Sequence, residues 1–173
     1  VSANLDTIAI RFPNHKLIRP VLKKVNFPIA MPSANISSGV SPVTAEDVAD
    51  EFKKKIKIII NGGNSKIGIE STVIDLTKKP KILRPGIIDA DIISKVLKSR
   101  VKIVKKSSKI TSPGMLKKHY SPGIPIFLNK KSTNKKNAFI ILGNKFRNKK
   151  NYFNLSQNAD LKQAASNLYK TLR

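Results

Sequence analysis

Residues 31–47 read MPSANISSGVSPVTAED, and they directly follow an apolar run, VNFPIA, at 25–30. The stretch places hydroxyl groups, a carboxamide and two prolines between an expected short strand at 27–31 and a helix that Thr44 can cap. A strand that leads into a stiff polar loop and then into a helix is a suitable place to bind a charged small molecule. The stretch therefore predicts an α/β fold with a ligand site at this loop.

The spacing of apolar residues predicts further elements on both sides of this loop. Strands are expected at 7–13, 27–31, 55–60, 71–77, 81–84, 124–128 and 138–142. Helices are expected at 17–25, at 44–54, from Asp89 onward, and at 160–173 with Leu161 on the inward face. The two strands within 71–84 should pair as a hairpin.

The composition divides the chain into three parts. Residues 105–123 are rich in Ser, Pro, Gly and Lys and show no periodicity, which is typical of an inter-domain linker. We expect residues 1–104 to form a twisted, mixed α/β sheet with helices, incomplete on one side. Residues 124–173 are expected to begin a second, small α/β unit.

The residue types present exclude several kinds of chemistry. The chain contains no cysteine, so disulfides and thiolate catalysis are excluded, and His15 and His119 show no metal-ligand spacing. No apolar run approaches the ~20 residues of a membrane span. The first residues lack the pattern of a secretory leader, so a cytoplasmic location without a membrane partner is expected.

The net charge of +24 is concentrated in the second half of the chain. Residues 1–91 hold 14 basic and nine acidic residues, whereas residues 92–173 hold 20 basic residues and one acidic residue. A basic surface can bind nucleic acid by releasing phosphate counterions. The alternative is a compositional bias toward Lys, Ile and Asn, and Lys lacks the bidentate geometry of Arg.

Candidate binding residues lie where polar side chains follow apolar strands. Ser33, Asn35 and Ser41 can hydrogen-bond a nucleotide, or they can simply cap turns. Arg11 and Arg84 each end an expected strand, where a long cation suits a carboxylate or phosphate, or each is a surface arginine.

The second candidate set has equally simple structural alternatives. The hydroxyl of Ser71 could contact an amino-acid ligand, whereas Glu70 fits a paired structural carboxylate better than a base. Tyr120 could lie over a nucleotide or be an unstructured linker residue. The chain lacks a P-loop and the Gly-x-Ser-x-Gly pattern, and no nucleophile–base pair is visible, so no catalytic residue or metal ligand is assigned. Positioning and charge stabilisation are the expected catalytic tools.

Several motifs, taken in order, resemble the YrdC-domain family of threonylcarbamoyl-AMP synthases. They are TIAIRFPNH at 7–15, PSANIS at 32–37 with SPVTAEDV at 41–48, GIESTVID at 68–75, ILRPG at 82–86 and SPGMLKKHYSP at 112–122. The last motif resembles the linker to a small Rossmann-like domain in the long form of the family. The resemblance implies that 1–104 are the C-terminal part of a YrdC-like domain and that 124–173 begin the Rossmann-like domain.

The resemblance also implies a reaction and its ligands. The family condenses L-threonine, bicarbonate and ATP into threonylcarbamoyl-adenylate and pyrophosphate, and partner proteins transfer the threonylcarbamoyl group to tRNA. By position, L-threonine is implied at Arg11, Met31 and Ser71. ATP is implied at Thr7, Ser33, Asn35, Ser41, Arg84 and Tyr120, with Mg²⁺ carried by the triphosphate and no protein ligand to the metal.

Two departures from the family pattern bear on activity. The usual KPSPT appears as GVSPV at 39–43, so Val43 replaces a hydroxyl residue. The Lys-x-Arg segment with which the family grips ATP has no counterpart in this sequence, so an N-terminally truncated and inactive fragment is expected. Two alternatives remain: a non-catalytic YrdC-type module that binds tRNA or double-stranded RNA, and a related carbamoyl-adenylating domain of hydrogenase maturation.

Overall fold

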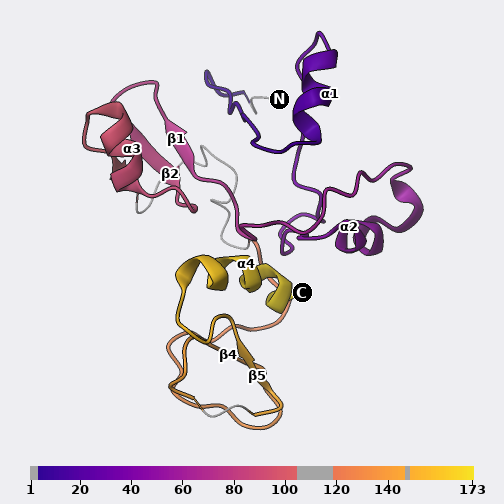
Figure 1. Ribbon diagram of the computed structural model, residues 1–173, viewed down its shortest axis with the longest axis vertical. Helices are drawn as coiled ribbons and strands as arrows, with labels where there is room; N and C mark the ends of the chain where they lie inside the picture. The colour runs from indigo at the N-terminus through magenta and orange to yellow at the C-terminus, as the bar shows by residue number, and fades with distance from the viewer. Residues whose placement is uncertain (1–3, 105–118, 147–148) are drawn as a thin grey trace.

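The computed structural model describes residues 4–104, 119–146 and 149–173 (Figure 1). The elements in chain order are α1 (Ile18–Lys24), α2 (Ala45–Phe52), the short 3₁₀ helix η1 (Lys53–Lys55), β1 (Val73–Asp75), β2 (Lys81–Arg84), α3 (Ala90–Leu97), β3 (Lys102–Ile103), β4 (Phe139–Ile141), β5 (Tyr152–Asn154) and α4 (Leu161–Leu172). Within these ranges, no helix combines the length and apolar character needed to cross a membrane. Most of the expected linker, residues 105–118, lies outside the described residues.

Capping side chains fix where the helices begin. At α2, Thr44 accepts a hydrogen bond from the Asp47 amide at 3.0 Å, and the Asp47 carboxylate accepts one from the Thr44 amide at 3.0 Å. This reciprocal pair is a capping box. Asp89 caps α3 and Asp160 caps α4 by accepting backbone amide hydrogen bonds. The four expected helices are confirmed, and α1 and α2 are shorter than predicted.

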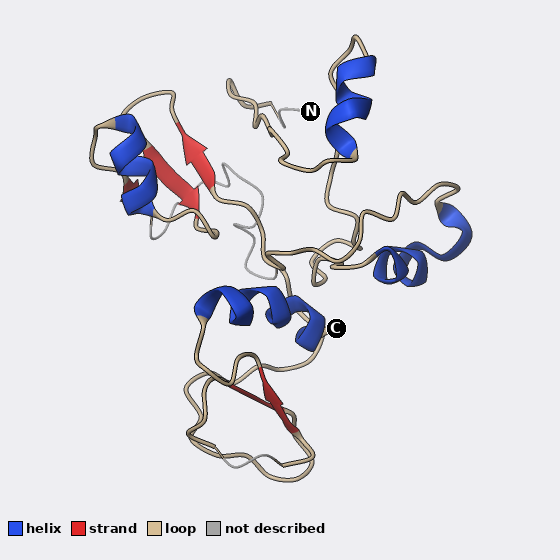
Figure 2. Cartoon of the chain, viewed as in Figure 1, coloured by secondary structure: helices blue, strands red, loops and turns tan. Residues whose placement is uncertain are grey.

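Two small sheets carry the strands, and Figure 2 shows them as separate groups of arrows. β1 and β2 form the expected antiparallel hairpin, with Val73 opposite Arg84, and β3 pairs with β2 in parallel. The second sheet pairs β4 with β5 in parallel, with Phe139 opposite Tyr152. The sequence predicted β4 but not β5. The mixed α/β fold class is therefore confirmed.

The strands expected at 7–13, 27–31, 55–60 and 124–128 were wrong: these residues have no strand conformation in the structure. A strand exists only where a neighbouring strand accepts and donates its backbone hydrogen bonds. No such neighbour pairs with these segments among the described residues. Their apolar side chains are largely exposed, with Ile10 at 89% and Ile58 at 80%.

Helix α4 packs against the first part of the chain and forms the core that positions the candidate site. Val40, Val43 and Tyr169 are buried together there, and Leu168 and Leu172 of α4 pack against them. Leu161, expected to face inward, is 72% exposed because the buried residues of α4 lie further along the helix.

A glycine permits the close approach of residue 68 to helix α4. Gly68 has a φ of +72°, and a Cβ at this position would lie 2.5 Å from the Ser166 carbonyl oxygen and 2.8 Å from that of Ala165. Any larger residue would push the segment off the helix backbone. The sequence motif around Gly68 therefore meets a packing requirement at α4.

We predict that Gly68→Ala lowers the free energy of unfolding by about 3 kcal/mol, from the left-handed backbone and the overpacking together. Gly63→Ala is the matched control, since Gly63 has a φ of +79° and no heavy atom lies within 4 Å of the point that an alanine Cβ would occupy. The control should cost only about 1 kcal/mol. Urea denaturation of both variants measures the difference, and equal losses would show that α4 does not press on residue 68.

Candidate functional site

A buried arginine gathers side chains from three separate segments of the chain. Arg84 and Ser41 are each 8% exposed. The Ser41 hydroxyl donates to Glu70 Oε1 at 2.5 Å, and Glu70 Oε2 lies 3.6 Å from Arg84 Nη2. Ser71 and Tyr120 complete the group, which we call the Arg84 cluster: Ser41, Glu70, Ser71, Arg84 and Tyr120. A charge removed from water in this way needs such partners.

The geometry of the β1–β2 hairpin directs the arginine toward these partners. Arg84 ends β2, and Ser71 lies just before β1 on the antiparallel neighbour. Arg84 Nε donates to the Ser71 carbonyl at 3.0 Å, and Nη2 reaches the Ser71 hydroxyl at 3.4 Å. Arg84 Nη1 donates to the Tyr120 hydroxyl at 2.8 Å. All three guanidinium nitrogens therefore have protein partners.

Tyr120 joins the hairpin to helix α4. Its ring stacks on that of Tyr169 with centroids 5.8 Å apart, and His119 meets it edge-on at 4.1 Å. The Ser121 amide donates to the Ser38 carbonyl at 2.9 Å. This bond ties the segment to residues 35–44, the loop before α2, which we call the serine-rich loop. Tyr120 is therefore an ordered part of the site and not an unstructured linker residue.

Burial and the Glu70 carboxylate disfavour ionisation of both stacked tyrosines. Burial raises the pKa of Tyr120, Glu70 raises it further, and Arg84 and Arg11 act in the opposite direction. Burial, again with Glu70, raises the pKa of Tyr169 to about 12. Arg11 itself is exposed.

In the serine-rich loop, Asn35 carries a buried side-chain acceptor without a partner among the described residues. The Asn35 side-chain nitrogen donates to the carbonyls of Ile36 at 2.8 Å and Gly39 at 3.2 Å. Its Oδ1 is buried and has no hydrogen-bond partner in the part of the chain that the structure describes. A buried acceptor of this kind can take a donor from a ligand.

The structure gathers some of the sequence-predicted site residues and leaves others outside. Ser41, Ser71, Arg84 and Tyr120 lie together in the Arg84 cluster. Within the described residues, no hydrogen bond joins the remaining ATP and threonine candidates to this cluster. They are Thr7, Arg11, Met31, Ser33 and Asn35, and all but Asn35 are exposed.

Two residues central to this geometry were not among the predicted ligands. Glu70 was interpreted as a paired structural carboxylate, and its contacts with Ser41 and Arg84 confirm that interpretation. Tyr169 was not singled out. Its position on the amphipathic pattern of the last helix was the only local signal, and its partner Tyr120 is 49 positions away in the sequence.

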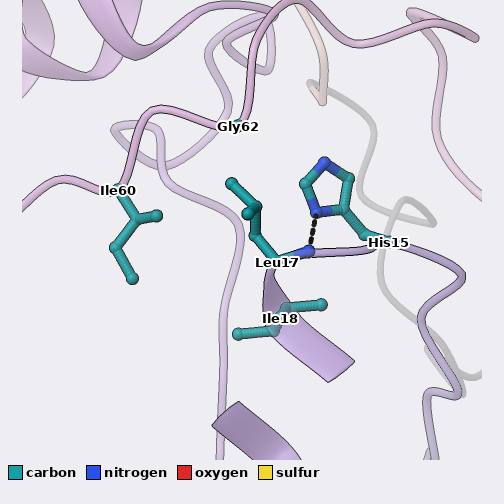
Figure 3. Close-up of a pocket in the computed structure, with 5 residues that line it drawn as sticks. All are labelled: His15, Leu17, Ile18, Ile60 and Gly62. Atoms are coloured by element: carbon teal, nitrogen blue, oxygen red, sulfur yellow. Dashed lines mark hydrogen bonds between the residues drawn. The ribbon is translucent and has the colours of Figure 1, made fainter. Parts of the chain in front are cut away.

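A separate cavity of about 150 Å³ lies beside α1 (Figure 3). It is lined by His15, Leu17, Ile18, Ile60 and Gly62, and His15 Nδ1 accepts from the Leu17 amide at 3.3 Å. The lining is mainly apolar and includes none of the predicted site residues. Among the residues described, no group of three or more His, Asp or Glu side chains is arranged to hold a metal ion.

A serine-rich loop before a capped helix, a buried arginine at a strand end and a tyrosine from the following linker define a YrdC-type α/β protein. A family profile described as "Telomere recombination" (Sua5_yciO_yrdC) matches residues 1–86. A second, described as "Threonylcarbamoyl-AMP synthase, C-terminal domain", matches residues 88–173. The chain belongs to the threonylcarbamoyl-AMP synthase family.

Individual relatives agree with this assignment. The threonylcarbamoyl-AMP synthase of Pyrococcus abyssi is 40% identical over 134 residues, which are 74% of this chain and 39% of that protein. The Bacillus subtilis enzyme of the same name is 40% identical over 131 residues, 73% of this chain and 38% of that protein. The crystal structure of P. abyssi Sua5 complexed with L-threonine matches 99% of this chain and 56% of that chain, with 31% identity and a TM-score of 0.79. The chain thus spans about two fifths of the length of these curated relatives.

We predict that Tyr120→Phe lowers the free energy of unfolding by about 1.5–3 kcal/mol, because it removes a hydrogen bond to a charged and buried group. Tyr152→Phe is the control, since the Tyr152 hydroxyl makes no hydrogen bond within the described residues and its aromatic contacts survive the change. The control should change stability by less than about 0.5 kcal/mol in urea denaturation. Equal effects would mean that the Tyr120 hydroxyl does not support Arg84.

We predict that one of the three tyrosines ionises near pH 12 and that Tyr169→Phe removes this step. The fold favours the protonated phenol, so its contribution to stability is complete below the unfolded pKa of about 10. The contribution is lost as the pH rises through about 12. Phenolate absorbance during alkaline titration measures the step, and a high-pH step that persists in the variant contradicts the assignment.

Proposed function

We propose that this chain forms part of the substrate site of an enzyme that condenses L-threonine, bicarbonate and ATP into threonylcarbamoyl-adenylate. The observation that carries the proposal is the Arg84 cluster. It joins the loop at Ser41, the hairpin at Arg84 and the linker at Tyr120, and these are segments that the two family profiles match. The second profile and the named relatives favour this activity over an RNA-binding module.

ATP is assigned to one set of residues. Arg84 offers a cation for the phosphates, and the Tyr120 ring provides an aromatic surface that an adenine base can stack on. Asn35 Oδ1 provides a buried acceptor, and an adenine amino group is a suitable donor for it. The full set proposed for ATP is Thr7, Ser33, Asn35, Ser41, Arg84 and Tyr120.

L-Threonine is assigned to Arg11, Ser71 and Met31. Arg11 is exposed and can pair with the carboxylate of the amino acid, since a guanidinium and a carboxylate fit each other bidentately. The Ser71 hydroxyl lies 3.4 Å from Arg84 Nη2. Threonine at Ser71 would therefore lie beside Arg84, the cation that we assign to the ATP phosphates. The backbone near Met31 would complete this side of the site.

The reaction is a nucleotidyl transfer. The threonine amine forms a bond to the carbon of bicarbonate, whose C–O bond breaks with release of water, and an oxygen of the resulting carbamate attacks the α-phosphorus of ATP. An oxygen–phosphorus bond forms while the bond from the α-phosphorus to pyrophosphate breaks. Arg84 and hydroxyl donors stabilise the charge that accumulates on the phosphate oxygens. Mg²⁺ enters with the triphosphate of the substrate.

We place the reaction in the cytoplasm. Threonylcarbamoyl-transfer proteins would pass the threonylcarbamoyl group of the product to tRNA.

The 173 residues alone should show no threonine-dependent pyrophosphate release, because Thr7, Arg11, Met31 and Ser33 lie exposed and make no hydrogen bond to the Arg84 cluster within the described residues. The test is a chimera that carries all 173 residues in place of the structurally equivalent part of the P. abyssi synthase. We predict that this chimera releases pyrophosphate only when threonine, bicarbonate and ATP are all present.

In the chimera, Arg84→Ala should lower kcat/KM by about 100-fold, as expected for removal of a donor to the reacting phosphate. Arg100→Ala is the matched control, because Arg100 is an exposed arginine in the same part of the chain. It should leave the rate unchanged. An inactive chimera that is folded, or equal rates for the two variants, would refute the proposed function.

A further inference from the structure

Helix α2 carries two carboxylates one helical turn apart, and each bridges the same two regions. Asp47 Oδ2 accepts from the amides of Val43 at 2.8 Å and Thr44 at 3.0 Å, while Oδ1 lies 3.5 Å from Arg173 Nε. Glu51 repeats this arrangement further along α2. In both cases one oxygen holds the backbone of the serine-rich loop and the other holds Arg173.

Glu51 links Arg173 to the start of that loop. Its Oε1 accepts from the Ile36 amide at 2.5 Å, and its Oε2 lies 2.7 Å from Arg173 Nη2. Arg173 Nη1 also donates directly to the Val40 carbonyl at 2.7 Å. The loop is therefore fixed at both ends and in the middle by groups that meet at one guanidinium.

The setting makes these contacts strong. The side chains of Arg173 and Glu51 are only 20% and 12% exposed, so their charges are poorly screened by water. Burial acts to raise the pKa of Asp47, but the amide hydrogen bonds and the Arg173 charge outweigh it and hold this pKa below its usual value. The arrangement is an ion-paired cluster and not a set of separate surface charges.

Packing does not replace these contacts on this side of the loop. A hollow of about 310 Å³ is lined by Gly39 and Val40 of the loop, by Glu51, by Ser121 and by Arg173 at the end of α4. On the side that faces Tyr169, apolar side chains pack against the loop at Val40 and Val43. Next to the hollow, polar contacts to Arg173 hold the backbone.

We propose that Arg173 is a positioning residue: through Glu51, Asp47 and the Val40 carbonyl it holds residues 36–44 in the conformation that presents Asn35 and Ser41 to a nucleotide. The end of helix α4 thereby sets the geometry of a loop more than 120 positions away in the sequence. The inference rests on the proposed function for its consequence in catalysis. The coupling of Arg173 to the loop stands without that function.

The coupling is measured first, on the 173-residue chain without nucleotide. Arg173→Ala should accelerate hydrogen exchange of the Ile36 amide by at least about tenfold, since a hydrogen bond to a charged group typically contributes that much. The Val104 amide, which donates to Ile82 in the β2–β3 sheet at 2.9 Å, should exchange as before. Lys170→Ala removes an exposed charge from the same helix and should leave both amides unchanged.

The consequence for the site is measured in the chimera described above. Arg173→Ala should raise KM for ATP by about tenfold and leave KM for threonine unchanged, because Arg11 and Ser71 lie outside the loop. Arg173→Lys should recover part of the ATP affinity, since an ammonium can hold Glu51 but lacks the fork that also reaches Val40. A variant that is merely less folded would lose kcat and keep both KM values.

The exchange and kinetic measurements test the coupling of Arg173 to the loop and its positioning role separately. Unchanged exchange at Ile36, or uniformly faster exchange that includes Val104, overturns the coupling. Faster exchange of the Ile36 amide, combined with an unchanged KM for ATP in an active chimera, overturns the positioning role. If the chimera neither binds nor uses ATP, the proposed function fails, and the exchange result still decides whether Arg173 holds the loop.

Discussion

The guanidinium of Arg84 is the constraint around which the described structure is organised. An arginine that is 8% exposed has lost most of its hydration, and the uncompensated cost of burying such an ion amounts to several kcal/mol, roughly. Glu70 supplies the opposite charge, and Ser71 and Tyr120 supply oxygen acceptors. Because these partners come from the hairpin and the linker, satisfying one cation brings distant segments of the chain together.

Helix α4 supports this arrangement from outside the cluster. Tyr169 stacks on Tyr120 and is buried with Val40 and Val43, so the apolar side of the helix holds both the linker tyrosine and the loop. Arg173, at the end of the same helix, holds the opposite side of the loop by hydrogen bonds. The matches of two family profiles to the two halves of the chain therefore describe units that share one core.

Local signals were readable from the sequence, and long-range pairing was not. Thr44 and Asp89 each cap a helix by accepting a hydrogen bond from the amide three residues further along, so their positions could be predicted. Strand formation at Ile10 or Ile58 depends on a neighbouring strand, which no local pattern reports. At the site, motif order identified Arg84, but Tyr169 escaped notice because its role depends on a contact 49 positions away.

The site residues fall into a preformed set and an open set, and this difference sets how a ligand could bind. Ser41 and Arg84 are already immobilised by protein partners, so their conformational entropy is lost on folding and not on binding. All three Arg84 nitrogens also have protein partners already, so a phosphate must share or replace these contacts and gains less than it would from a guanidinium with no partners. An exposed cation such as Arg11 instead exchanges its hydrogen bonds to water for hydrogen bonds to the ligand. A ligand should therefore gain most of its affinity from exposed residues such as Arg11, whereas the buried Ser41 and Arg84 align it.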